Sequence, residues 1–80
     1  MKYAGGQTVA VGDRVRLGKD SVGEVVCILD SGGYSDAYPE SEWGYLKEGV
    51  LINFPLLGLI HYPEIEPDVR LLIPRGLSEQ

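Results

Sequence analysis

The chain has 80 residues, a hydrophobic content of 44% and one cysteine, which suffices for one small domain with a thin core and excludes an intramolecular disulfide. Its 12 acidic and 7 basic residues give a net charge of −5. Because nucleic-acid-binding domains usually carry the opposite sign, we expect no nucleic-acid partner. The N-terminus lacks a signal-peptide pattern, and no apolar run approaches the ~20 residues of a membrane span, so we expect a cytoplasmic protein without membrane contact.

The first predicted strand covers residues 8–17. Val9, Val11, Val15 and Leu17 share odd positions, whereas Arg14 and Arg16 occupy even positions. Gly12-Asp13 interrupts the pattern as a bulge or bend would. This alternation is typical of a strand with one buried face. The strand is therefore expected to turn its arginines toward solvent.

The second predicted strand, residues 23–30, is apolar along nearly its whole length, which indicates that both of its faces are covered. Residues 31–44 follow as the longest irregular stretch, and loops of this length are often functional. Within the loop, Pro39–Trp43 can form one helical turn, because proline is tolerated at a first helical position.

Three more strands are predicted in the second half of the chain, at residues 49–54, 58–62 and 69–73. The first two form a hairpin through a short Pro/Gly turn. Five short strands with tight turns predict an all-β fold, a five-stranded SH3-like barrel with one long loop. The whole chain is expected to be one domain with flexible ends at residues 1–7 and 75–80.

Two short motifs carry a resemblance to a known class of domain, Gly12-Asp13-x-Val15-x-Leu17 and, after a loop, Gly23-x-Val25. They resemble the opening of KOW-type and related SH3-like barrel domains, in which a GD-x-V strand leads to a G-x-V strand. The whole chain is similar to small uncharacterised bacterial proteins of the kind also carried on mobile gene cassettes. KOW-type domains often bind RNA or transcription factors, but here only Arg14, Arg16 and Lys19 cluster near the first turn.

The long loop is the first candidate site, because it combines aromatic and acidic residues: Tyr34, Asp36, Tyr38, Glu40, Glu42, Trp43 and Tyr45. Aromatic rings beside carboxylates suit a cationic or proline-rich partner segment. The alternative is that Trp43 and Tyr45 simply cover one open end of the barrel.

The second candidate site consists of aliphatic residues that a single barrel core leaves in water: Leu51, Pro55, Leu56, Leu57 and Leu72. Two of them fall on the strand face opposite the predicted core. The other three occupy a hairpin tip, where polar residues are usual. We expect this surface to form an oligomer interface, most simply in a homodimer. The alternative is ordinary surface hydrophobicity.

No catalytic residue, metal site or cofactor is predicted. His61 is the only histidine and has no companion ligands at metal-binding spacing, so we expect a half-buried strand residue that faces away from the core. Cys27 lies in an apolar strand and is expected to be a small buried hydrophobe.

The predicted function is a non-enzymatic binding or adaptor module that acts through protein–protein contacts as a homo-oligomer. Two alternatives stay open. One is an acidic antidote or inhibitor of a basic protein such as a toxin or nuclease. The other is a small-ligand-binding protein or weak enzyme that uses the loop at residues 31–45.

Overall fold

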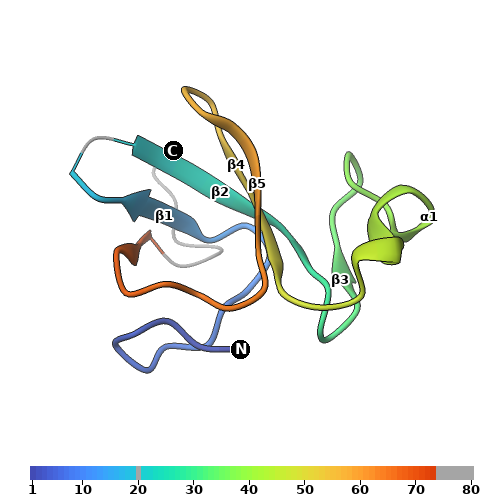
Figure 1. The fold of residues 1–80 in the computed structure, drawn as a ribbon, viewed down its shortest axis with the longest axis horizontal. Helices are drawn as coiled ribbons and strands as arrows, with labels where there is room; N and C mark the ends of the chain where they lie inside the picture. The colour runs from blue at the N-terminus through green and yellow to red at the C-terminus, as the bar shows by residue number, and fades with distance from the viewer. Residues whose placement is uncertain (20, 74–80) are drawn as a thin grey trace.

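The computed structural model describes residues 1–19 and 21–73 (Figure 1). Its strands are β1 (Arg14–Leu17), β2 (Ser21–Ile28), β3 (Gly33–Tyr34), β4 (Val50–Phe54), β5 (Gly58–Tyr62) and β6 (Val69–Ile73). A short helix α1 (Glu40–Trp43) and a 3₁₀ turn η1 (Gly44–Leu46) lie between β3 and β4. The flexible end predicted for residues 75–80 falls outside the described residues.

The strands form one six-stranded antiparallel sheet in the order β5-β4-β2-β1-β6, with β3 paired to β2 beside this path. A mainly β fold with one short helix is therefore confirmed. The predicted closed barrel of five strands is not confirmed, because the sheet is open and β3 adds a sixth strand. Strands β5 and β6 stand at opposite ends of the order.

The N-terminal segment helps to cover the core that an open sheet leaves accessible. Tyr3 and Val9 are buried in the main cluster, and Met1 packs against it. The Tyr3 hydroxyl donates a 2.7 Å hydrogen bond to Asp13 Oδ2. The backbones of Lys2 and Thr8 form an isolated antiparallel β-bridge. Residues 1–7 were expected to be a flexible lead, but they contribute directly to the core.

The main core lies on one face of the sheet, which we call the inner face. Alternate residues of β4 point to it, and they pack with valines of β1, β2 and β6; its central members are Val15, Val25, Val50, Ile52, Phe54 and Val69. The exposed Arg14 and Arg16 flank Val15 on β1, as the alternation predicts. Strand β1 is shorter than the predicted strand because the chain turns at Gly12, where φ is 97°.

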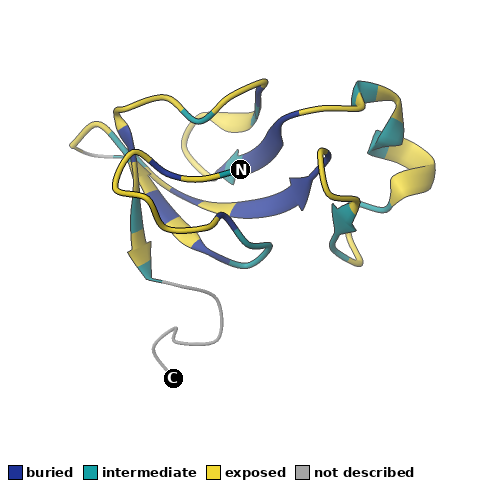
Figure 2. Ribbon diagram, turned by 90° about the horizontal axis from the view of Figure 1, so that it is seen from below, coloured by how far each residue is buried: buried dark blue, intermediate teal, exposed yellow. Residues whose placement is uncertain are grey.

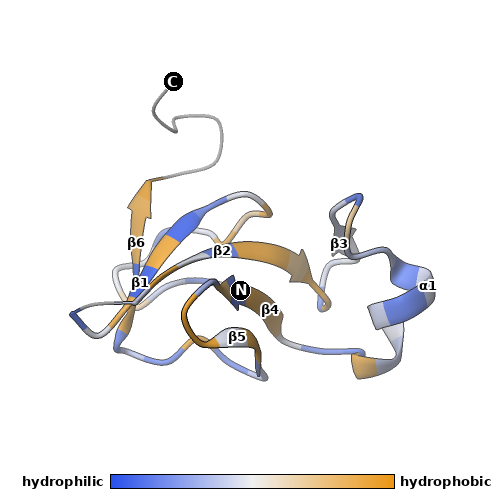
Figure 3. Cartoon of the chain, turned by 90° about the horizontal axis from the view of Figure 1, so that it is seen from above, coloured by the Kyte–Doolittle hydropathy of each residue, from blue (hydrophilic) through white to orange (hydrophobic). Residues whose placement is uncertain are grey.

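A second, smaller cluster lies on the opposite face of β2 and β4, near the loop. Its buried members are Val26, Cys27, Leu29 and Leu51, with Tyr34, Tyr38, Trp43 and Leu46 packed against them. The second half of β2 is hydrophobic along its length (Figure 3), and both of its faces are covered, as the sequence indicates. Leu51 is only 2% exposed, so the expectation that it lies on a free surface is wrong.

The loop that carries β3, α1 and η1 projects from one end of the sheet (Figure 1). Figure 2 shows that exposed residues concentrate in the turns and in α1, whereas the middle of the sheet is buried. The molecule measures 32 × 27 × 23 Å. Its two ends therefore differ: the loop covers one, and strand turns form the other.

Candidate functional site

The aromatic residues of the long loop form a lid over the second cluster. The rings of Tyr38 and Trp43 lie 6.0 Å apart between centroids, at an interplanar angle of 47°. Two hydrogen bonds tie the lid to β2: Cys27 Sγ donates to the Tyr38 carbonyl at 3.2 Å, and Ser35 Oγ donates to the Val26 carbonyl at 2.8 Å. These contacts give the lid a packing role.

Trp43 and Tyr34 show what burial does to polar groups in the lid. The indole Nε1 of Trp43 is buried and has no acceptor among the described residues. Burial, with smaller contributions from Glu40 and Cys27, raises the pKa of the Tyr34 hydroxyl. Neither group offers an acid or base suited to chemistry near neutral pH.

The remaining loop residues face solvent and do not gather with the lid. Asp36, Glu40 and Glu42 are exposed, and Tyr45 is 70% exposed. The structure thus divides the first candidate site. The rings of Tyr38 and Trp43 lie next to each other, but the exposed Tyr45 does not pack with them.

The hairpin-tip residues of the second candidate site are exposed to solvent, as expected. Leu56 is 80% and Leu57 is 53% exposed, and Pro55 is also exposed. The turn is closed by a 2.9 Å hydrogen bond from the Leu57 amide to the Phe54 carbonyl. Two aliphatic side chains therefore stand in water at a well-defined turn.

Two exposed residues that the sequence analysis did not single out extend this surface. Leu59 lies opposite Asn53 in the β4–β5 ladder, and Val22 belongs to β2; both are exposed. The alternation of β5 could have identified Leu59, whereas Val22 falls before the predicted start of the second strand. We call Val22, Pro55, Leu56, Leu57 and Leu59 the hairpin-tip patch.

A shallow pocket of about 250 Å³ joins the hairpin-tip patch to the neighbouring strands. It is lined by Arg14, Val22, Gly23, Glu24, Asn53 and Pro55. The ladders place Glu24 opposite both Arg14 and Asn53. The pocket therefore lies across β1, β2 and β4 on the face away from the main core, which we call the outer face.

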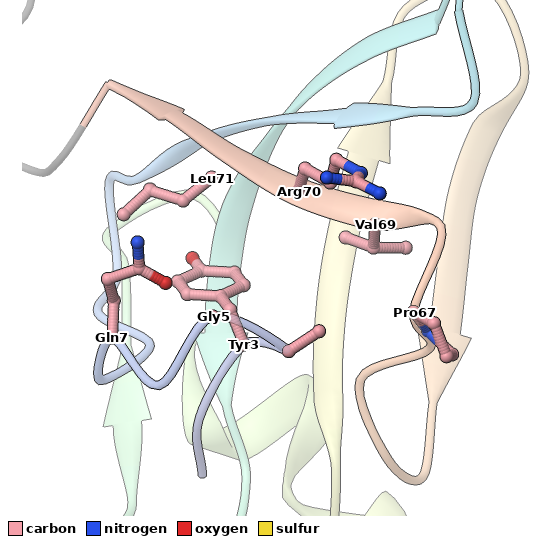
Figure 4. A pocket seen from close by; sticks show the side chains of 8 residues that line it. Tyr3, Gly5, Gln7, Pro67, Val69, Arg70 and Leu71 are labelled. Atoms are coloured by element: carbon pink, nitrogen blue, oxygen red, sulfur yellow. The ribbon is translucent and has the colours of Figure 1, made fainter.

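A larger pocket of about 410 Å³ lies between the N-terminal turn and β6 (Figure 4). Val69 and Leu71 point toward Tyr3 in this view, whereas the side chain of Arg70 points to the other side of β6. The Tyr3 hydroxyl is already bound to Asp13. The pocket thus offers mainly apolar walls and the amide of Gln7.

A third pocket, of about 360 Å³, is lined by residues 63–67. Residues 31–45 line none of these three pockets. A ligand site in the long loop therefore gains no support from them.

His61 and Cys27 have packing and hydrogen-bonding roles. The Nε2 atom of His61 hydrogen-bonds the Glu48 carbonyl at 2.8 Å, with the ring N–H as donor. Burial raises the pKa of the Cys27 thiol, which disfavours the nucleophilic thiolate. Within residues 1–19 and 21–73, no three side chains of His, Cys, Asp or Glu gather in a way that could hold a metal ion.

No helix in the described part of the chain has the length and apolar character that crossing a membrane requires. Comparison of the chain with protein-family models, with curated proteins and with solved structures finds no match.

Proposed function

We propose that this chain is a non-enzymatic protein-binding module of SH3-like type that self-associates through the hairpin-tip patch. One observation carries the proposal: Leu56 and Leu57 stand 80% and 53% exposed at a hairpin tip. Polar residues are usual at such turns. Val22 and Leu59 continue the apolar surface onto the outer face.

The magnitude of this surface favours weak association. Complete burial of a Val or Leu side chain contributes about 1.5–3 kcal/mol. Leu56, Leu57, Val22 and Leu59 are 80%, 53%, 42% and 38% exposed, so covering them buries the equivalent of about two side chains and contributes on the order of 3–6 kcal/mol in each protomer. Association itself costs about 4–15 kcal/mol in lost freedom, before side-chain ordering. The patch can thus support a reversible contact, and additional contacts must set its orientation.

A two-fold dimer is the simplest arrangement, because each patch can then meet its own copy. The tip is suited to this because it projects from the sheet (Figure 1). The SH3-like type remains part of the proposal, supported by the short antiparallel strands and the GD-x-V opening on β1.

The proposal is tested with two single substitutions at exposed apolar residues. Leu56→Glu places a carboxylate in the patch, whereas Tyr45→Glu makes the same charge change in the loop at the other end of the sheet. We expect the wild type and Tyr45→Glu to form dimers at high micromolar concentration in light scattering. Leu56→Glu should remain monomeric, because docking would bury an unpaired charge.

Both substitutions lie at strongly exposed positions, so both variants should unfold at nearly the wild-type denaturant concentration. Equal association by Leu56→Glu and the wild type would show that the patch is not the interface.

A further inference from the structure

The open sheet has two edge strands, β5 and β6, and only β6 carries features that normally keep an edge from pairing. Strand β6 carries the charged Arg70, and its ladder with β1 shifts register. Charges and bulges of this kind blunt an edge. Strand β5 has the sequence Gly-Leu-Ile-His-Tyr, which contains no proline, lysine, arginine or acidic residue. The composition of β5 therefore leaves its edge open to pairing with another strand.

The hydrogen bonds at the start of β4 determine which backbone groups of β5 face away from the sheet. The Leu29 amide donates to the Gly49 carbonyl at 2.8 Å, so the odd-numbered residues of this segment bond toward β2. Because the direction of these bonds alternates along a strand, the even-numbered residues of β4 bond to β5. Their ladder partners there are Gly58, Ile60 and Tyr62. The amides and carbonyls of Leu59 and His61 therefore point outward.

The outward edge of β5 is accessible to solvent. Leu59 is exposed, and Ile60 and His61 are half-buried. Figure 3 shows β5 at the margin of the ribbon, beside β4. Within the described part of the chain, no backbone hydrogen bond from a segment other than β4 reaches β5. The edge thus presents backbone donors and acceptors that a further strand can bond.

Two copies of β5 can satisfy these groups by pairing with each other in antiparallel orientation. When a two-fold axis passes beside Ile60, this residue lies opposite the partner's Ile60. Leu59 of each copy then lies opposite the partner's His61. Both residues of such a pair have outward backbone groups, so they can exchange both N–H···O bonds.

Neighbouring positions of the axis fit less well. An axis at Leu59 would require the amide of Leu57, which already donates to the Phe54 carbonyl at 2.9 Å. An axis at His61 would require an amide hydrogen from Pro63, which proline lacks. The backbone groups of the strand and its two ends therefore favour the axis at Ile60.

The same register joins the apolar surfaces of the two copies. Ile60 packs against the main core, so the paired isoleucines would continue that core across the axis. On the outer face, Leu59 would pack on the partner's His61. Farther along, Leu57 of the hairpin-tip patch would lie toward the partner's Pro63. The strand pairing and the hairpin-tip patch therefore form one continuous interface.

We infer that two copies of this chain pair antiparallel through β5, with a two-fold axis at Ile60, so that the sheet continues from one copy into the other. This inference rests on the proposed self-association and names the contact that orients it. A second copy is the occupant, because each β5 presents the donors and acceptors that the other needs. Since β6 is blunted, the pairing closes at two copies.

Amide hydrogen exchange of the wild type, followed by NMR at low and high micromolar concentration, tests the strand pairing. The Leu59 and His61 amides should exchange about tenfold more slowly once about nine-tenths of the chains are dimeric. The Ile60 amide should change less, because it already bonds to β4. Side-chain contact at the hairpin tip alone would not produce this alternation. The amides of β6 are the internal control and should keep their rates.

A disulfide-trapping experiment tests the register. Opposed residues of an antiparallel pair have Cα atoms about 4.5–5.5 Å apart, which is within disulfide reach. Under mild oxidation, Ile60→Cys should therefore cross-link two copies about tenfold or more faster than Leu59→Cys or Leu72→Cys. Non-reducing electrophoresis measures the rates.

The two slower variants are matched controls. Leu59→Cys lies one position from the axis, and Leu72→Cys lies on the other edge strand. Both positions are more than a third exposed, whereas Ile60 is half-buried, so accessibility by itself favours the controls. All three variants retain the buried thiol of Cys27.

The outcomes separate the two proposals. Dimers whose Leu59 and His61 amides exchange at the monomer rate would overturn the strand pairing and leave self-association in place. Cross-linking of either control as fast as Ile60→Cys would overturn the register. A wild type that stays monomeric would overturn both proposals. If Ile60→Cys does not fold, hydrogen exchange of the wild type still decides whether β5 pairs.

Discussion

Gly49 is the residue that fixes where the long loop returns to the sheet. Its φ is 93°, and a Cβ there would lie 2.2 Å from the Tyr62 carbonyl oxygen. The Gly49 amide donates to Asp30 Oδ1 at 3.0 Å, and its carbonyl accepts from the Leu29 amide at 2.8 Å. Both the space and the backbone conformation therefore require glycine.

We predict that Gly49→Ala lowers the free energy of unfolding by about 3 kcal/mol or more, because a backbone clash adds to the strain of the positive φ. Gly32→Ala is the matched control. It shares a positive φ of 73°, but nothing lies within 4 Å of its Cβ position, so it should cost only about 1 kcal/mol. Urea unfolding of both variants measures the difference, and equal losses would contradict the clash.

Asp13, the aspartate of the GD-x-V motif, has a structural role. Its carboxylate accepts hydrogen bonds from the Tyr3 hydroxyl at 2.7 Å and from the Ala10 amide at 2.8 Å. Its backbone carbonyl accepts from the Val25 amide at 3.0 Å. The aspartate of the GD-x-V opening thus fastens the N-terminal segment to the sheet.

The long loop acts as a packing element. Its aromatic residues were expected to bind a partner, but several of them cover the second cluster. Trp43 packs against a cluster that contains the fully buried Cys27. Removing the indole should therefore loosen the loop and expose the thiol. The loss of an aromatic side chain from a core costs about 3–5 kcal/mol, and somewhat less is expected here because Trp43 is partly exposed.

We predict that Trp43→Ala accelerates alkylation of Cys27 by about tenfold or more, since it weakens the contacts that keep the thiol covered. Trp43→Phe should react at nearly the wild-type rate, because it retains a ring and the indole N–H has no acceptor to lose among the described residues. Alkylation followed by mass spectrometry measures both rates. Equally slow reaction of all three proteins would show that Trp43 does not cover the cluster.

The elements also show what the sequence could predict. The strands at 49–54, 58–62 and 69–73 match β4, β5 and β6 to within one residue, because alternation of side chains is a local property. What covers each face depends on segments distant in the chain. For that reason Leu51 was expected in solvent and lies under the lid, while Tyr3 was expected in a flexible lead and lies in the core.

The same reasoning applies to the candidate sites. Exposure of Leu56 and Leu57 could be predicted, because a tight hairpin tip cannot fold back onto its own core. The opposition of Arg16 and Arg70 could not be predicted, because it depends on the β1–β6 register. That register joins residues more than fifty positions apart, and the sequence alone does not fix it.

At the scale of the whole molecule, the two ends of the sheet have different properties. At one end the loop buries the apolar outer face of β2 and β4. At the other end the outer face is open, with exposed leucines at the hairpin tip and the exposed Arg14 and Arg16 on β1. An open, chemically mixed surface of this kind is typical of a reversible protein–protein contact.

The most direct test of this account is the molar mass of the wild-type chain in solution, measured by light scattering from low to high micromolar concentration. The account predicts that the mass rises from the 8.8 kDa of one chain toward twice that value. A mass that stays at that of one chain throughout the range would contradict it.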